Sequence, residues 1–407
     1  MLHAHDILLP GELVRKHVAL HRITLRAAIS CEPEFPVSNT YFAHSYRSFP
    51  IHLIRLDLCA TGARQAARPV LTPSRAALIL GLLLPGGGFV LIRNFIFWLS
   101  TKRGVTDRIA RHGMKNGFAR RFVAGETLAE ALTASQELCS QGRNVSLNHL
   151  GENVTSEAAA REVCASYIQM VEELHAKNLT GNISIKLTQL GLDIDRGLCR
   201  SMAREIAARA ATLGRSIEMD MEGSVYTDVT LDIFEAVQQE LGNCGLAVQA
   251  YLFRTEKDLQ RLAPIKPKIR LVKGAYREPA KIAYQKKSDV DANYKKLTTF
   301  LLEGAAQGTY LPAIASHDWN MVAHAQAEAA RLKLDKSRYE FQMIYGIRRD
   351  LQEQVRAAGD TLQVYVPFGT DWCPYFMRRL SERPANCWFV LRSLLAESGT
   401  PSRQPAT

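Results

Sequence analysis

The chain has 407 residues, of which 47% are hydrophobic and 22% are charged. These values predict one large globular domain or two ordinary ones, and they exclude a disordered chain and a small scaffold held by disulfides or metals. The net charge of +11 favours anionic partners, namely cofactor phosphates, carboxylate substrates, an acidic membrane surface or nucleic acid. The eight cysteines include no C-x-x-C pair, so we expect free thiols in a reducing compartment and no metal site.

Residues 1–89 lack the regular spacing of apolar residues that the rest of the chain shows. Histidines are concentrated near the start, no helical or alternating apolar period persists, and no secretory signal is evident. We interpret this part as an N-terminal extension that is disordered or not part of the true protein. Two alternatives stay open: a transit peptide, against which Asp6 and Glu12 argue, and an upstream frame translated ahead of a start at Val90 or Leu91.

Residues 76–99 form the only candidate membrane span. The segment is long enough for a bilayer, but Pro85 and the glycines after it break the helix at its middle, and Arg93 adds a charge. A packed or interfacial helix is therefore favoured over a span, within a helical arm over 90–140. We expect a cytoplasmic protein. Peripheral contact with the inner face of the plasma membrane, through the basic stretch 102–121, is the alternative to a solvated helix face.

After this arm, short apolar runs alternate with segments of helical period. The runs lie at 144–149, 183–188, 216–221, 246–252, 268–274, 310–315, 339–345 and 361–366. Between them, Thr155 and Thr230 are expected to begin two helices, and Gly242 is expected to end the second. Thr255 with Asp258 has the spacing of a capping box.

The order of these elements predicts the fold. Near-continuous apolar strands that alternate with helices indicate parallel strands covered by helices. Eight such units predict an α/β protein with a distorted (β/α)8 TIM-type barrel over 141–395, an N-terminal helical extension and a tail over 396–407. The rival fold, a doubly wound open sheet, lacks the Gly-x-Gly-x-x-Gly that follows the first strand in dinucleotide-binding proteins.

Polar side chains gather at the carboxyl ends of the expected strands, where the active site of such a barrel lies. They are Asn148, His149, Lys186, Asp220, Gln249, Arg270, Lys273, Ser316, His317, Gln342 and Tyr365. Lys186 and Arg270 fall inside apolar runs, and a buried cation is costly unless it is paired. Each is therefore expected to meet Asp220, a ligand carboxylate or a phosphate. A salt bridge inside the barrel is the alternative.

The expected last helix, at 372–382, places four polar residues on one face. Tyr375, Arg378, Arg379 and Glu382 follow the spacing i, i+3, i+4 and i+7. Two adjacent arginines beside a tyrosine suit the bidentate capture of a carboxylate. The alternative is an exposed charged face with an ion pair between Arg379 and Glu382.

At these residues the sequence resembles the flavin-dependent proline dehydrogenases, of the monofunctional bacterial type. The matching segments include ISIKLTQLG (183–191), RLVKGAYREP (270–279), YEFQMIYG (339–346) and the terminal YVPFGTDWCPYFMRRLSERPANCWFVLRS (365–393). The resemblance extends over roughly 115–395, with the motifs in matching order. One departure is Asn148, which stands where the family usually has Asp.

The resemblance implies the first step of proline catabolism, the oxidation of L-proline to Δ1-pyrroline-5-carboxylate. Non-covalent FAD would take the hydride at N5 and pass electrons to a membrane quinone. Asp220 and Arg270 would be catalytic. The substrate would be bound by Lys186, Ile344, Tyr365, Tyr375, Arg378 and Arg379. The cofactor would be bound by Met221, Gln249, Arg270, Lys273, Gly274, Ser316, His317 and Glu382.

Three alternatives stay open. One is a flavoenzyme that acts on a related cyclic or N-substituted amino acid, because a single pocket residue can decide the substrate. Another is a Schiff-base aldolase barrel that uses Lys186 or Lys273, both at strand ends. The third is a nucleic-acid-binding module, which only the net charge suggests. No basic patch with interleaved aromatics supports it, so we expect no nucleic acid partner.

Overall fold

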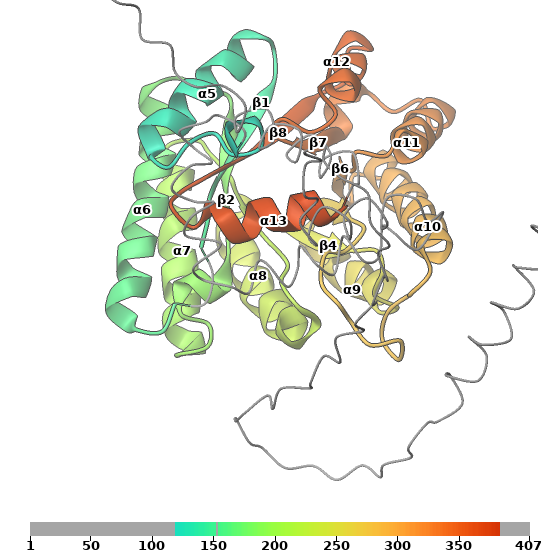
Figure 1. Ribbon diagram of the computed structural model, residues 1–407. Helices are drawn as coiled ribbons and strands as arrows, with labels where there is room; N and C mark the ends of the chain where they lie inside the picture. The colour runs from blue at the N-terminus through green and yellow to red at the C-terminus, as the bar shows by residue number, and fades with distance from the viewer. Residues whose placement is uncertain (1–118, 152–153, 383–407) are drawn as a thin grey trace, which may run out of the picture. The chain divides into compact units, whose positions relative to one another are not determined.

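The computed structural model describes residues 119–151 and 154–382. Eight parallel strands close into a barrel in chain order, and the first strand pairs with the last. Helices surround the barrel (Figure 1). The predicted (β/α)8 barrel is confirmed, and the closed sheet excludes the doubly wound alternative.

The strands coincide with the eight apolar runs. They are β1 (Asn144–His149), β2 (Gly181–Ile185), β3 (Ile217–Met219), β4 (Cys244–Gln249), β5 (Lys268–Val272), β6 (Leu311–Ala315), β7 (Glu340–Ile344) and β8 (Leu362–Phe368). Gly181 begins β2 with φ +135° beside Val145, where a Cβ atom would lie 1.9 Å from the Val145 carbonyl oxygen. Only glycine therefore permits this close approach of the two strands.

The helices follow the strands as the alternation predicted. They are α5 (Leu128–Ser140), α6 (Glu157–Ala176), α7 (Arg196–Thr212), α8 (Thr227–Leu241), α9 (Thr255–Leu262), α10 (Lys287–Ala306), α11 (Trp319–Arg331), α12 (Arg349–Ala357) and α13 (Trp372–Glu382). Short 3-10 turns occur at Ala119–Arg121, Leu187–Leu190, Ser224–Tyr226, Ala263–Ile265 and Lys336–Arg338.

Helix α6 shows why these segments fold as they do. Its residues Tyr167, Met170, Val171 and Leu174 are buried, on the face that the helical period predicted. Full burial of a side chain of this size stabilises the fold by about 1.5–3 kcal/mol. The apolar stripe therefore holds the helix against the strands.

Two expected helix starts are displaced. The N-cap of α6 is Ser156 rather than Thr155, and the Ser156 hydroxyl accepts a hydrogen bond from the Ala159 N–H. Helix α8 begins at Thr227, one turn before Thr230, and its end at Gly242 is confirmed.

The capping box expected at Thr255 and Asp258 is wrong. Arg254 is the N-cap of α9, without a side-chain cap. The Thr255 hydroxyl donates instead to the Gln249 carbonyl oxygen at 2.5 Å, and Asp258 forms an ion pair with Arg254 at 2.7 Å. Both side chains are therefore engaged with partners that local spacing does not reveal. The capping box that the structure contains joins Thr127 and Glu130 at the start of α5.

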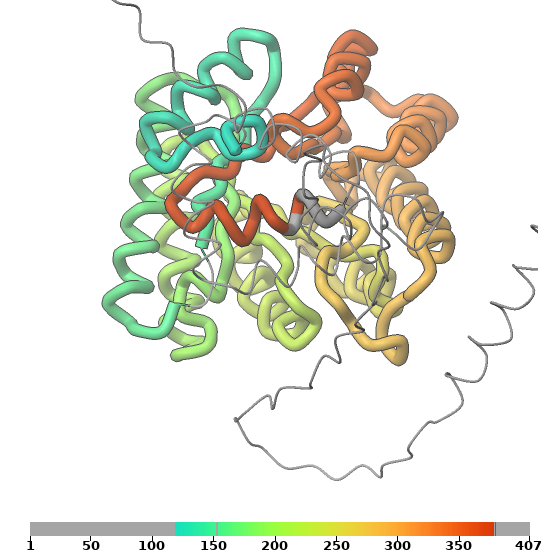
Figure 2. Tube along the Cα trace, viewed as in Figure 1, coloured from blue at the N-terminus to red at the C-terminus, as the bar shows by residue number. Residues whose placement is uncertain are grey.

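Helix α13 lies across the mouth of the barrel, in front of the ring of outer helices (Figures 1 and 2). A separate apolar cluster packs it against the segment 119–123, with Phe122, Trp372 and Phe376 at its centre. The Trp372 indole N–H donates to Glu126 at 3.0 Å. Residues far apart in the sequence thus hold this helix in place.

Within residues 119–151 and 154–382, no helix is long and apolar enough to cross a membrane. The candidate span 76–99 lies outside these residues, as do the extension 1–89 and the tail 396–407. The five cysteines in the described part of the chain are free thiols.

Candidate active site

A cavity of roughly 830 Å³ lies at the carboxyl ends of the strands. Of the residues expected to form the site, Lys186, Asp220, Met221, Arg270, Lys273, Gly274, Ser316, His317, Ile344, Tyr365, Tyr375 and Arg379 line it. Arg378 and Glu382 lie in α13, and their side chains are outside the described part of the structure. The cavity has the volume and position typical of a ligand site in this kind of barrel.

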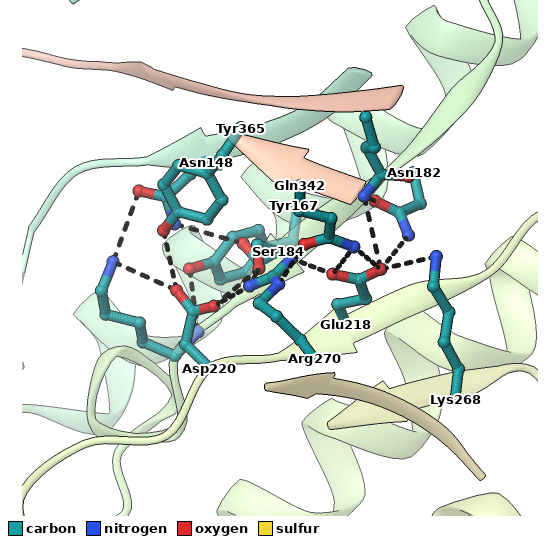
Figure 3. Close-up of polar contacts among 12 residues, drawn as sticks. Asn148, Tyr167, Asn182, Ser184, Glu218, Asp220, Lys268, Arg270, Gln342 and Tyr365 are labelled. Carbon is teal, nitrogen blue, oxygen red and sulfur yellow. Dashed lines mark hydrogen bonds and ion pairs between the residues drawn. The ribbon is translucent and has the colours of Figure 1, made fainter. Parts of the chain in front are cut away.

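Asp220 lies at the centre of the polar contacts below the cavity (Figure 3). It directly follows β3 and accepts hydrogen bonds from Ser184 at 2.8 Å, Tyr365 at 2.8 Å and Arg270 NH1 at 2.5 Å. Lys186 Nζ lies 4.0 Å from its Oδ2 atom. Burial raises the pKa of Asp220, whereas Lys186 and the hydrogen bonds from Tyr365 and Ser184 oppose that rise. The contact with Arg270 also favours the ionised form of this carboxylate.

Arg270, on β5, is held on every nitrogen of its guanidinium. NH1 contacts Asp220, Nε donates to the Gln342 amide oxygen at 2.5 Å, and NH2 donates to Glu218. The guanidinium carbon lies 5.3 Å from the centre of the Tyr365 ring. Burial lowers the pKa of Arg270 to about 10, so the group keeps its charge at neutral pH.

Lys186 and Arg379 bring two more cations to the same cavity. Lys186 is 8% exposed and donates to the Asn148 side-chain oxygen at 3.4 Å. The Arg379 guanidinium carbon lies 5.3 Å from the centre of the Tyr375 ring on α13. A carboxylate could be held between these cations beside the aromatic rings. The predicted clamp also includes Arg378, so this part of the site stays a prediction.

Glu218 and Ser184 were missed by the sequence analysis, which considered strand ends. Successive side chains of a strand point to opposite faces, so Glu218 faces the barrel interior together with Asp220, two positions later. Polar residues recur at this spacing on six strands. The inward positions are Ser146 and Asn148; Asn182, Ser184 and Lys186; Glu218 and Asp220; Lys268 and Arg270; Glu340 and Gln342; and Gln363 and Tyr365. This spacing of two is the signal that would have found them.

Lys273 and His317, two residues expected to bind the cofactor, also line the cavity. Lys273 forms ion pairs with Asp291 at 2.5 Å and Asp318 at 2.9 Å. His317 Nε2 accepts a hydrogen bond from the Ile344 N–H at 2.8 Å, which requires this nitrogen to be unprotonated. The histidine thus fixes the end of β7 at Ile344, which lines the cavity.

Gly274 and Gln249 were both expected to bind the cofactor, but only Gly274 lines the cavity. Gly274 lines the cavity with φ +121°, and a Cβ atom there would lie 2.4 Å from the Tyr251 ring. Gln249, expected to contact the cofactor, does not line the cavity. Its amide donates to the Glu222 carbonyl oxygen at 2.7 Å. Gln249 therefore supports the wall from behind.

The chain matches the sequence family described as Proline dehydrogenase over residues 131–392. It is 35% identical over 305 residues to Proline dehydrogenase 1 of Bacillus subtilis (strain 168), a match that covers 75% of this chain and 99% of that protein. It is 39% identical over 299 residues to Proline dehydrogenase of Deinococcus radiodurans, with 72% and 95% covered.

Among solved structures, proline utilization A (PutA) from Bdellovibrio bacteriovorus, inactivated by N-propargylglycine, is similar with a TM-score of 0.61 and 25% identity. That match covers 65% of this chain and 32% of the PutA chain, so this chain spans about a third of the length of that larger protein. The barrel, the order of the motifs and these likenesses agree, and the chain belongs to the proline dehydrogenase family.

Proposed function

We propose that the protein oxidises L-proline to Δ1-pyrroline-5-carboxylate with FAD as the hydride acceptor. The observation that carries the proposal is the gathering of Lys186, Arg270 and Arg379 with Tyr365 and Tyr375 around one cavity. Three cations beside two aromatic rings suit a small amino acid, whose carboxylate meets the charges and whose ring meets the aromatic walls.

The residues of the cavity fit a flavin dinucleotide. A volume of roughly 830 Å³ exceeds what a single amino acid fills and leaves room for an elongated cofactor. Lys273, Lys287 and Arg348 also line the cavity, and these cations, which are paired with aspartates in this structure, could turn to the phosphates of a dinucleotide. Gly274, where a side chain would collide with Tyr251, leaves backbone open to close approach.

The chain's own residues prepare the substrate for oxidation. Lys186 and Arg379 would hold the carboxylate, and Ile344 would close the pocket beside the aromatic rings. The cations Lys186 and Arg270 disfavour a protonated substrate amine, and loss of hydride requires this amine to be neutral. FAD, when bound, supplies the acceptor for the hydride. Asp220 holds Arg270 and Tyr365 in position.

Other parts of the proposal rest on the family alone. A membrane quinone would receive the electrons, and the protein would work in the cytoplasm with peripheral membrane contact. The aldolase alternative is disfavoured at Lys273, because a Schiff base there would break its ion pairs with Asp291 and Asp318. A related cyclic or N-substituted amino acid remains the second candidate substrate.

An anaerobic absorbance spectrum before and after addition of L-proline tests the proposal. We expect a flavin band near 450 nm, the usual position for oxidised flavin, that bleaches with L-proline and not with D-proline. A band that persists with L-proline would transfer the proposal to another substrate. Absence of bound flavin after reconstitution with FAD would refute it.

A further inference from the structure

Glu218 is a buried carboxylate on β3 that does not line the cavity. Its side chain is 1% exposed. Every neighbour within hydrogen-bond distance donates to it. These donors are Asn182 at 3.1 Å, Gln342 at 3.0 Å, Gln363 at 3.3 Å, Lys268 at 2.8 Å and Arg270 NH2. Such a site fits an ionised carboxylate, which accepts through both oxygens and donates nothing.

The guanidinium of Arg270 lies between two carboxylates (Figure 3). Asp220, which lines the cavity, accepts from NH1, and Glu218, deeper in the barrel, accepts from NH2. The Gln342 amide accepts from Nε and donates to Glu218. A rotation of the guanidinium would break contacts on several sides at once, so its orientation is fixed from below the cavity.

Lys268 and Arg270 both contact Glu218, but only Arg270 also lines the cavity. The Lys268 ammonium lies 2.8 Å from Glu218 and 2.8 Å from Glu340. Lys268 therefore balances buried charge without contacting the groups around the substrate pocket. Substitution of Lys268 therefore tests the balance of buried charge separately from the orientation of the Arg270 guanidinium.

We propose that Glu218 is a positioning residue for the reaction: it fixes the Arg270 guanidinium with NH1 towards Asp220 and the cavity. The inference rests on the proposed function, in which Arg270 acts beside the flavin and the substrate. Loss of Glu218 leaves Asp220, Ser184 and Gln342 as the acceptors for Arg270 and frees the NH2 edge to turn.

Three variants of the FAD-loaded protein test this role: Glu218→Gln, Lys268→Met and the double variant. Glu218→Gln leaves a buried cation unbalanced, and Lys268→Met leaves a buried carboxylate unbalanced, so each is expected to lower the thermal unfolding temperature. The double variant restores equal numbers of buried cations and carboxylates. Its unfolding temperature is therefore expected to lie above that of Glu218→Gln.

Turnover of L-proline separates orientation from stability. We expect Glu218→Gln and the double variant to lose about tenfold in kcat while the proline KM changes less, because a charge-assisted contact to Arg270 is absent in both. Lys268→Met is expected to keep kcat near that of the wild type. In the double variant, kcat and the unfolding temperature could both return towards the wild-type values. Glu218 would then serve only to balance the charge of Lys268, and the proposal would be wrong.

A crystal structure of the double variant gives a readout that does not depend on turnover. We expect the Arg270 guanidinium to turn, so that its NH2 atom leaves the position beside residue 218 that it has in the wild type. An unmoved guanidinium would overturn the positioning role even if kcat fell. If the wild type does not oxidise L-proline, the proposed function fails, and the crystal structure still decides whether Glu218 orients Arg270.

Discussion

Replacement of Tyr365 by phenylalanine isolates one hydrogen bond in the candidate site. The change keeps the ring against Arg270 and removes the hydroxyl that donates to Asp220 at 2.8 Å. A hydrogen bond to a charged group contributes about 1.5–3 kcal/mol, and one pKa unit corresponds to about 1.4 kcal/mol. The pKa of Asp220, already raised by burial, is therefore expected to rise further in Tyr365→Phe.

The pH dependence of kcat/KM for L-proline measures this shift. The acid limb of the profile is expected to move to higher pH in Tyr365→Phe. Tyr226→Phe is the matched control, because the Tyr226 hydroxyl donates to Asp193 at 3.1 Å and neither residue lines the cavity. An acid limb that stays in place in Tyr365→Phe, or that moves equally in the control, would refute the role assigned to the Asp220 contacts.

The free energy of unfolding gives a second measurement of the rise in the pKa of Asp220. Because burial raises the folded-state pKa of Asp220 above its usual value of 3.8, its contribution to stability is present below that value and is lost as pH rises through the folded pKa. A further rise in this pKa enlarges the loss at neutral pH by about 1.5–3 kcal/mol. Denaturant unfolding of Tyr365→Phe and the wild type should therefore differ at pH 7 and converge in acid.

Three further substitutions test the walls of the cavity. Arg379→Met is expected to raise the proline KM by one to three orders of magnitude, at about 1.4 kcal/mol per decade, and an unchanged KM would contradict the carboxylate clamp. Lys186→Met is expected to raise the KM by about tenfold, as measured in the same assay, through loss of one charge-assisted contact. Gly274→Ala is expected to lower the unfolding temperature and FAD affinity, because its Cβ meets the Tyr251 ring. Gly142→Ala, which also has positive φ but no neighbour within 4 Å, measures the backbone strain alone, and equal losses in both would rule out the collision.

The fold was predictable because its signals are local. Short apolar runs gave all eight strands, and Gly242 marked the end of α8 through its left-handed conformation. Helix starts were less predictable, since Ser156, Thr155 and Thr230 are all suitable caps and the choice depends on packing. Thr255 shows the limit clearly, because its hydroxyl bonds the Gln249 carbonyl oxygen across a turn rather than its own helix.

The candidate site was predictable at the carboxyl-terminal halves of the strands and not deeper in the barrel. Asp220, Arg270 and Tyr365 were expected from their positions, and the structure brings them into contact. Glu218 was missed because only strand ends were considered, although it lies two positions before Asp220 on the same face; its partners on four other strands cannot be identified from the sequence of β3. The orientation of Arg270 depends on side chains from several strands of the closed barrel. The sequence of one strand therefore does not reveal it.

Because β1 pairs with β8, the barrel cannot close until the last strand has been synthesised. Until Leu362–Phe368 emerges, the backbone edges of β1 and β7 lack their strand partner, and Tyr365 is absent beside Asp220. At about 5–20 residues per second, the stretch from Ile344 to Phe368 takes on the order of one to five seconds to synthesise. During that interval the nascent chain exposes two pairing edges, which are a route to aggregation. A ribosomal pause in this stretch would therefore lower the yield of folded protein.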